Sequence, residues 1–209
     1  MAMDIGELER RLGAERALVG RHDSWLYAKA RKIDIANEAD MQSVHELDLM
    51  MKHYMGEFHW IGVSSNNIYW TATEAPISVV RVPYPDREGH TTLLNPQIVK
   101  RSWPWRTYPS FETCGAKNDE SVQVMRHTFF KVDAFELIRG EPPKKVQYSY
   151  RLTEKQRQSP DKVHPVAIMQ HEFDHLQGIL IFNHPGISNG DLSLKSPRAP
   201  YSGKLFPMD

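Results

Sequence analysis

Three scarcities narrow the class of protein that this sequence can encode. Among the 209 residues there is one cysteine, which excludes an intramolecular disulfide framework. The 26 Lys and Arg residues are balanced by 26 Asp and Glu residues, so the chain has no excess charge with which to bind nucleic acid or an anionic membrane. No apolar run approaches the roughly 18 residues that a membrane-spanning helix needs. The N-terminal segment mixes Asp, Glu and Arg and lacks the apolar stretch of a secretory signal. We therefore expect a soluble, intracellular protein that binds neither nucleic acid directly nor a membrane.

The length and composition of the chain fit one globular domain. Hydrophobic residues make up 40% of the chain and charged residues 25%, which excludes a disordered chain and a coiled coil. We expect a single domain over residues 1–209, with an N-terminal extension at 1–20. The segment 184–209 is rich in Pro, Gly and Ser, so it is expected to be an irregular C-terminal tail.

Hydrophobic spacing predicts one helix before a group of strands and one helix after it. Asn37 is a candidate N-cap for a helix over residues 38–55, which we expect to end near Gly56. Pro165 stands where a second helix, over 166–177, begins. The order predicts an α+β fold of mostly antiparallel strands around the C-terminal helix, with the N-terminal helix packed on the core. The other expected segments are a short exposed helix at 5–19, strand and loop at 58–70, strands at 77–82, 91–99, 122–138 and 146–152, and turns at 103–121.

The strongest chemical signal is the run His171-Glu172-Phe173-Asp174-His175 in the second helix. At 100° per residue, His171 and His175 lie one turn apart on the same face, as two ligands of one metal require. Glu172 lies beside that face, where it can act as a general base on a metal-activated water. Asp174 flanks the other side, where it can orient a ligand imidazole. The alternative interpretation is a helix with two surface histidines.

A catalytic metal of this kind needs a third protein ligand. The position that supplies it in metzincins holds Ile181, and no Glu follows Glu172, so the thermolysin-like pattern is absent as well. The candidates are Cys114 upstream and His184 or Asp191 in the tail. Considered alone, Cys114 is a metal ligand, a nucleophile or a buried small hydrophobic residue.

Two histidines on a helix with a single upstream cysteine resemble peptide deformylase, and further motifs extend the likeness. Residues 170–180, QHEFDHLQGIL, follow the family's QHExDHLxGxL in every fixed position. Residues 111–116, FETCGA, stand where the family has EGCLS, and residues 60–67, WIGVSSNN, stand for GIGLAAxQ. Residues 95–98 match its NPxI strand. In this order the motifs span roughly residues 20–183, so the chain is similar to this family over most of its length.

The resemblance implies hydrolysis of the N-formyl group from the N-formylmethionine of newly made polypeptides, with release of formate. It implies that Cys114, His171 and His175 hold one divalent metal, either Fe²⁺ or Zn²⁺ with Ni²⁺ as an alternative. Glu172 would take the proton of the attacking water. The implied partners are N-formylmethionyl peptides or nascent chains, with the ribosome as a further candidate. The other implied site residues are Gly62, Asn67 and Gly115 at the substrate and its oxyanion, and Gln170, Asp174 and Glu112 around the ligands.

Two departures from the family pattern fall on the side of the substrate. Asn67 replaces the family's Gln, and the missing methylene withdraws its amide by roughly 1.5 Å. Gly115 replaces a Leu, which keeps a backbone N–H but removes a side chain from the pocket wall. We therefore expect an intact metal site with a weakened substrate clamp. The alternative is a loop that lies closer to the metal and restores the contact through Asn67 or its neighbour Asn66.

Two other functions remain compatible with these residues. The first is a metal-dependent amidase or peptidase that acts on another substrate, which the altered motifs favour. The second is a deformylase-like protein that binds metal and peptide with weak or no turnover, against which the retained Glu172 argues. Formylated initiation occurs in bacteria and organelles, so bacterial cytoplasm, mitochondrion and plastid are all candidate locations. The altered motifs and the additional terminal segments favour a mitochondrion or another organelle.

Overall fold

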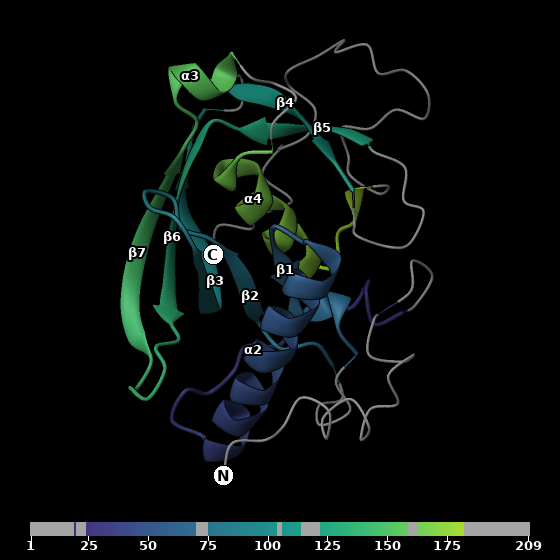
Figure 1. Cartoon of the computed structure of the whole chain (residues 1–209), viewed down its shortest axis with the longest axis vertical. Coiled ribbons are helices and arrows are strands. Elements are labelled where there is room, and N and C mark those ends of the chain that lie inside the picture. Colours follow the sequence, from purple (N-terminus) through teal and green to yellow (C-terminus); the bar gives the residue numbers. More distant parts are fainter. Residues whose placement is uncertain are drawn as a thin grey trace.

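Figure 1 shows a computed structural model of the chain. It describes residues 19, 24–69, 75–103, 106–113, 122–158 and 163–181. The helix expected over 5–19 lies outside these residues except for Val19, which is not helical, and the tail at 184–209 lies outside them entirely. Among the described residues, no helix is both long and apolar enough to cross a membrane.

The described strands form two antiparallel sheets. The larger sheet has the order β1-β2-β3-β6-β7, and a separate two-stranded sheet pairs β4 with β5. Burial alternates along the interior strand β6, where Phe130, Val132 and Ala134 are buried and the residues between them are partly exposed, as a sheet with one face on the core requires. The bounds are β1 Val63–Ser64, β2 Val79–Pro83, β3 His90–Arg101, β4 Thr107–Glu112, β5 Val122–His127, β6 Phe129–Glu136 and β7 Lys144–Arg151.

The long helix α2 runs over Glu38–Phe58 and confirms the predicted N-terminal packing helix. Asn37 is its N-cap, and its side-chain oxygen accepts hydrogen bonds from the backbone N–H groups of Ala39 and Asp40. The predicted end near Gly56 was wrong. The helix continues to Phe58 and ends at His59, which adopts a left-handed conformation with φ 54°.

The second predicted helix, α4, covers Pro165–Leu176 and lies among the sheets (Figure 1). It contacts β1, β2, β5 and β7, and ten of its residues are buried, so the predicted metal motif is carried on an element held from several sides. Pro165 opens it as expected. Gly178 follows it with φ 72°, and a Cβ there would lie 2.2 Å from the carbonyl oxygen of Tyr27. The end of α4 is thereby fixed against the segment around Tyr27.

Between these helices the structure adds detail to the prediction and differs from it at two elements. The segment expected to be strand and loop at 58–70 contains the short strand β1 and a 3₁₀ turn, η2 (Ser65–Asn67). The segment expected to be turns at 103–121 contains the strand β4. The helix α3 (Glu154–Arg157), capped by Thr153, was not predicted. The strands expected at 77–82, 91–99 and 146–152 are present as β2, β3 and β7, and 122–138 holds both β5 and β6.

Candidate active site

A cavity of about 460 Å³ opens beside the first part of α4. His171 and Glu172 line it from the helix, and Gly62 and Asn67 line it from the segment around β1. Glu112, at the end of β4, closes it from the other sheet. The cavity therefore brings together residues that the sequence spreads over more than a hundred positions. Its remaining wall includes the exposed apolar side chains of Phe58, Ile61, Phe111 and Val163.

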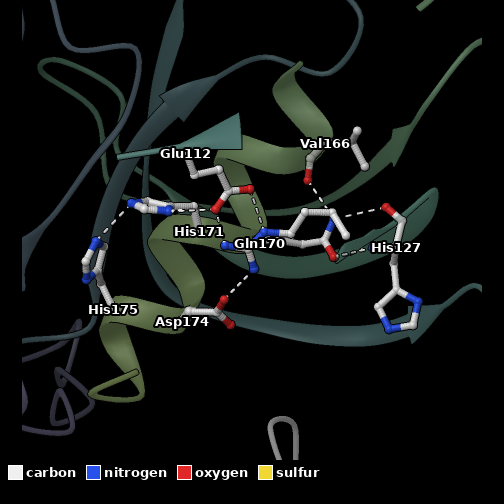
Figure 2. Close-up of polar contacts among 8 residues, drawn as sticks. Glu112, His127, Val166, Gln170, His171, Asp174 and His175 are labelled. Atoms are coloured by element: carbon white, nitrogen blue, oxygen red, sulfur yellow. Dashed lines mark hydrogen bonds and ion pairs between the residues drawn. The ribbon is translucent and has the colours of Figure 1, made fainter. Parts of the chain in front are cut away.

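The two histidines of the motif face one another at one side of this cavity. Their Nε2 atoms lie 3.0 Å apart, and the Nδ1 atom of His171 lies 3.0 Å from Oε2 of Glu112 (Figure 2). Because a carboxylate only accepts, Nδ1 of His171 carries the proton in this contact, and Nε2 is the nitrogen turned to His175. Burial lowers the pKa of His175 well below its ordinary value, which keeps its ring neutral.

Arg126 is the fully buried centre of the charge network behind the histidines. Its side chain is 0% exposed, and it donates to Oε1 of Glu112 at 2.7 Å, to Oε2 at 2.5 Å and to Asp174 Oδ2. Burial alone would raise the pKa of Glu112, but Arg126 overrides it and holds that pKa at about 2. Burial raises the pKa of Asp174, which Arg126 opposes. Glu112 thus stays ionised beside His171.

Glu172 is buried at the cavity wall and has an unusual electrostatic environment. Its Oε2 atom has no hydrogen-bond partner among the described residues, and burial raises its pKa to about 7. A Cβ added at Gly62 would lie 2.9 Å from Oε1 of Glu172 and 2.5 Å from a methyl carbon of Ile168. Only a glycine therefore fits beside this carboxyl group. A carboxylate with a pKa near neutrality is suited to accept and return a proton.

The arrangement of donors fits a divalent metal. Two imidazole nitrogens that converge at 3.0 Å repel each other unless they share a proton or a metal ion, and neutral imidazole is a common metal ligand. Carboxylate support of a ligand imidazole, here Glu112 on His171, is also usual in metal sites. Within the described residues no three candidate ligands converge. Cys114 and Gly115 lie outside those residues, so their placement stays a prediction.

Asn67 lines the cavity, but its side chain is engaged locally. Its Oδ1 atom accepts hydrogen bonds from the backbone N–H of Ser64 at 3.1 Å and from the Ser64 hydroxyl at 2.7 Å, which closes the 3₁₀ turn. Its neighbour Asn66 is fully buried and donates from Nδ2 to the carbonyl of Ala28 at 2.7 Å. Asn66 is therefore committed to the core.

The two other residues predicted around the ligands turn away from the histidines. Asp174 pairs with Arg126, so the carboxylate that contacts the His171 ring is Glu112. Gln170 binds the backbone of His127, accepting from its N–H at 2.9 Å and donating to its carbonyl at 3.0 Å (Figure 2). Gln170 thus joins α4 to β5, which carries Arg126.

Sequence reasoning missed Arg126. The one local signal for it is an arginine at an inward-facing position two residues after buried Val124 in β5, a place that a charged side chain occupies only when it is paired.

Comparison with known proteins identifies the family. The model of the polypeptide deformylase family matches residues 16–189. This chain belongs to the peptide deformylase family. It is a deformylase-like hydrolase that acts on an amide. No curated protein matches the sequence.

Solved structures of peptide deformylases share the fold. Peptide deformylase 1B of Arabidopsis thaliana, in complex with an inhibitor, is 24% identical with a TM-score of 0.61, and the match covers 90% of this chain and 87% of that one. The Met-Ala-Ser-bound class I type b peptide deformylase of Acinetobacter baumannii is 25% identical with a TM-score of 0.61, over 79% of this chain and 94% of that one. The deformylase of the Vibrio parahaemolyticus bacteriophage VP16T, in complex with actinonin, is 18% identical with a TM-score of 0.59, over 78% and 98%.

Proposed function

We propose that this deformylase-like hydrolase removes the N-formyl group from N-formylmethionyl peptides and releases formate. The observation that carries the proposal is the position of the buried carboxyl group of Glu172. Its Oε2 atom has no hydrogen-bond partner among the described residues, and it lines the same cavity as His171, whose ring converges with that of His175. This is the arrangement that proton transfer to and from a water at a metal centre requires.

In this proposal each residue of the site has a separate role. Glu172 accepts a proton from the water as its oxygen attacks the formyl carbon, and returns a proton to the amine nitrogen as the C–N bond breaks. The products are formate and a free α-amine. Glu112, held by Arg126, fixes the ring of His171. Asn67 and the backbone N–H of Gly115 are the proposed donors to the developing oxyanion.

His171, His175 and Cys114 are the residues that would hold the metal, and when bound it supplies Lewis acidity to the water and the carbonyl. A thiolate with two imidazoles suits Fe²⁺ or Zn²⁺, with Ni²⁺ as an alternative. Metal analysis of the Cys114→Ala variant, purified without oxygen, should show that most of the metal is lost. The control is His45→Ala, which changes an exposed histidine of α2 and should keep the metal. Full retention by Cys114→Ala would direct the assignment to His184 or Asp191.

The lining of the cavity supports an apolar peptide as the substrate. The exposed side chains of Phe58, Ile61, Phe111 and Val163 offer a hydrophobic wall to a methionyl side chain. The deformylase of Acinetobacter baumannii was solved with bound Met-Ala-Ser, a peptide that has the sequence of a deformylated product.

Formate release from formyl-Met-Ala-Ser tests the proposal. Wild type should release formate, and Glu172→Gln should lose at least ~100-fold in rate while keeping its metal. Acetyl-Met-Ala-Ser and the unblocked peptide are the comparison substrates. Cleavage of either of these in preference to the formyl peptide would indicate an amidase or a peptidase. Metal and peptide binding by a wild type that releases no formate would indicate a binding protein.

An organelle, such as the mitochondrion, is the location that we propose, and nascent chains at the ribosome are the proposed source of substrate. The altered residues at 60–67 and 111–116 support a divergent member of the family. Fractionation of the source cells and co-sedimentation with ribosomes test these two points.

A further inference from the structure

The short strand β1 stops pairing with β2 at a proline. Val63 pairs with Arg81 and Ser64 with Val80, so the same antiparallel register carried two residues further would set Ile61 opposite Pro83. Proline has no backbone N–H and cannot continue the ladder.

The missing N–H would have faced Ile61. The N–H of Tyr84 donates to Gly89 at 3.1 Å, and the carbonyl of Ser78 accepts from Asn95 at 2.7 Å, so these even-numbered residues of the β2 segment turn their polar groups toward β3. Because backbone polar groups alternate in direction along a strand, Pro83 turns its nitrogen toward β1. The carbonyl of Ile61 therefore lacks the ladder donor that any other residue at this position would offer.

A side chain from the next strand supplies a donor instead. His90 is the first residue of β3 and pairs with Pro83, and its Nε2 atom lies 3.1 Å from the carbonyl oxygen of Ile61. A carbonyl only accepts, so Nε2 carries the proton in this contact. The imidazole of His90 thus donates to the Ile61 carbonyl in place of the N–H that Pro83 lacks.

The segment held in this way forms one wall of the cavity. His59, Trp60, Ile61 and Gly62 all line it, and Gly62 is the residue that packs against Glu172. The segment leaves α2 through the left-handed His59, and the side chain of Ile61 is 48% exposed, so burial of that side chain contributes little to fixing it.

We propose that His90 is a positioning residue of the active site. Its hydrogen bond to Ile61 replaces the ladder bond that Pro83 cannot make, and holds residues 59–62 in place as the wall beside Glu172. The catalytic consequence rests on the proposed function, whereas the structural consequence does not.

Three variants of the full-length, metal-loaded protein test this assignment. His90→Leu removes the donor, and kcat/KM for formyl-Met-Ala-Ser should fall by about 3- to 10-fold, the effect of one hydrogen bond, with metal content unchanged. His90→Gln places an amide N–H at the same number of bonds from Cα, and should stay within about twofold of wild type. His45→Leu, an exposed histidine on α2, is the matched control and should change nothing.

The backbone offers an independent rescue. In the double variant Pro83→Val with His90→Leu, position 83 regains an N–H that faces Ile61, so kcat/KM should recover most of the loss. Hydrogen exchange of the amides in residues 60–64 follows the same order without any assay of activity, faster in His90→Leu and near wild type in His90→Gln and in the double variant.

Activity and hydrogen exchange of these variants together decide the role of His90. Activity and exchange in His90→Leu that equal wild type would overturn the assignment, and so would a Gln variant as impaired as the Leu variant. If wild type releases no formate, the proposed function fails, and the exchange rates alone then decide the role of His90.

Discussion

Glu112 and His171, 59 residues apart in the sequence, meet at 3.0 Å between Oε2 and Nδ1 at the back of the cavity. This contact selects the ring nitrogen of His171 that faces His175. The carboxylate making it is kept ionised by Arg126, with a pKa of about 2. The orientation of the His171 ring, a proposed metal ligand, thus depends on Arg126 of β5, which does not itself line the cavity and acts through Glu112.

Glu112→Gln is expected to weaken metal binding. The amide can still contact Nδ1 of His171, but it lacks the charge that makes the ring a better donor to a metal, and losses of support of this kind typically cost about 10- to 100-fold in metal affinity. Competition with a chromophoric chelator measures the affinity. Glu154→Gln, at the exposed helix α3, is the matched control. An unchanged affinity in Glu112→Gln would mean that the contact does not tune the site.

Arg126→Met is expected to destabilise the fold strongly. It leaves the buried carboxylates of Glu112 and Asp174 without their shared cation, and breaking a buried ion pair on one side costs about 3–5 kcal/mol. Urea denaturation measures the free energy of unfolding. Arg157→Met removes an exposed ion pair with Glu154 and should change the free energy of unfolding by under about 1 kcal/mol. Equal effects in the two variants would show that the buried network contributes no more than a surface pair.

The part of the site that could be predicted from the sequence is the part whose geometry is local. His171, Glu172 and His175 share one helix, whose start at Pro165 and end before Gly178 are both marked by residue type, so their angular relation follows from helix geometry alone. The contacts of Arg126 with Glu112 and Asp174 span 14 and 48 residues, and no periodicity reports such pairings.

Two errors in the predicted fold have different origins, one local and one tertiary. The helix α2 passes Gly56 because the rings of Tyr54 and Phe58 pack with centroids 6.0 Å apart across that turn. The strand β4 contains Pro109, which is typical of turns, and among the described strands it pairs only with β5, so its structure depends on a partner that is distant in the sequence.

The pH dependence of stability should reveal the buried Glu172. Its folded pKa of about 7 exceeds the ordinary value of 4.5, so between these values the folded state binds more protons than the unfolded state. The free energy of unfolding therefore falls as pH rises from about 4.5 to about 7, by on the order of 3 kcal/mol from this group. Denaturation of metal-free wild type and Glu172→Gln at several pH values isolates it, because the difference between the two should change across this window. A constant difference would contradict the raised pKa.

Asn67→Gln separates the structural and catalytic parts of Asn67. The asparagine closes the 3₁₀ turn through two contacts with Ser64, at 3.1 and 2.7 Å, and a longer side chain cannot keep both, so the free energy of unfolding should fall by about 1 kcal/mol. The same change extends the amide by roughly 1.5 Å into the cavity that Asn67 lines, toward the proposed oxyanion. We expect kcat/KM for a formyl-Met peptide to rise in spite of the lower stability, with metal content unchanged.

Asn67→Ala is the control, because it removes the turn contacts and the amide together and should lower both stability and kcat/KM. The decisive result is whether kcat/KM rises or falls in Asn67→Gln. A hydrogen bond of about 2.9 Å from the side-chain amide to the oxyanion is effectively lost when it is stretched past 3.5 Å, and the longer side chain would restore it. If Asn67→Gln lowers kcat/KM or leaves it unchanged, the shorter side chain is not what limits the oxyanion site. In that case the turn held by Ser64 already presents Asn67 at the distance that the substrate needs.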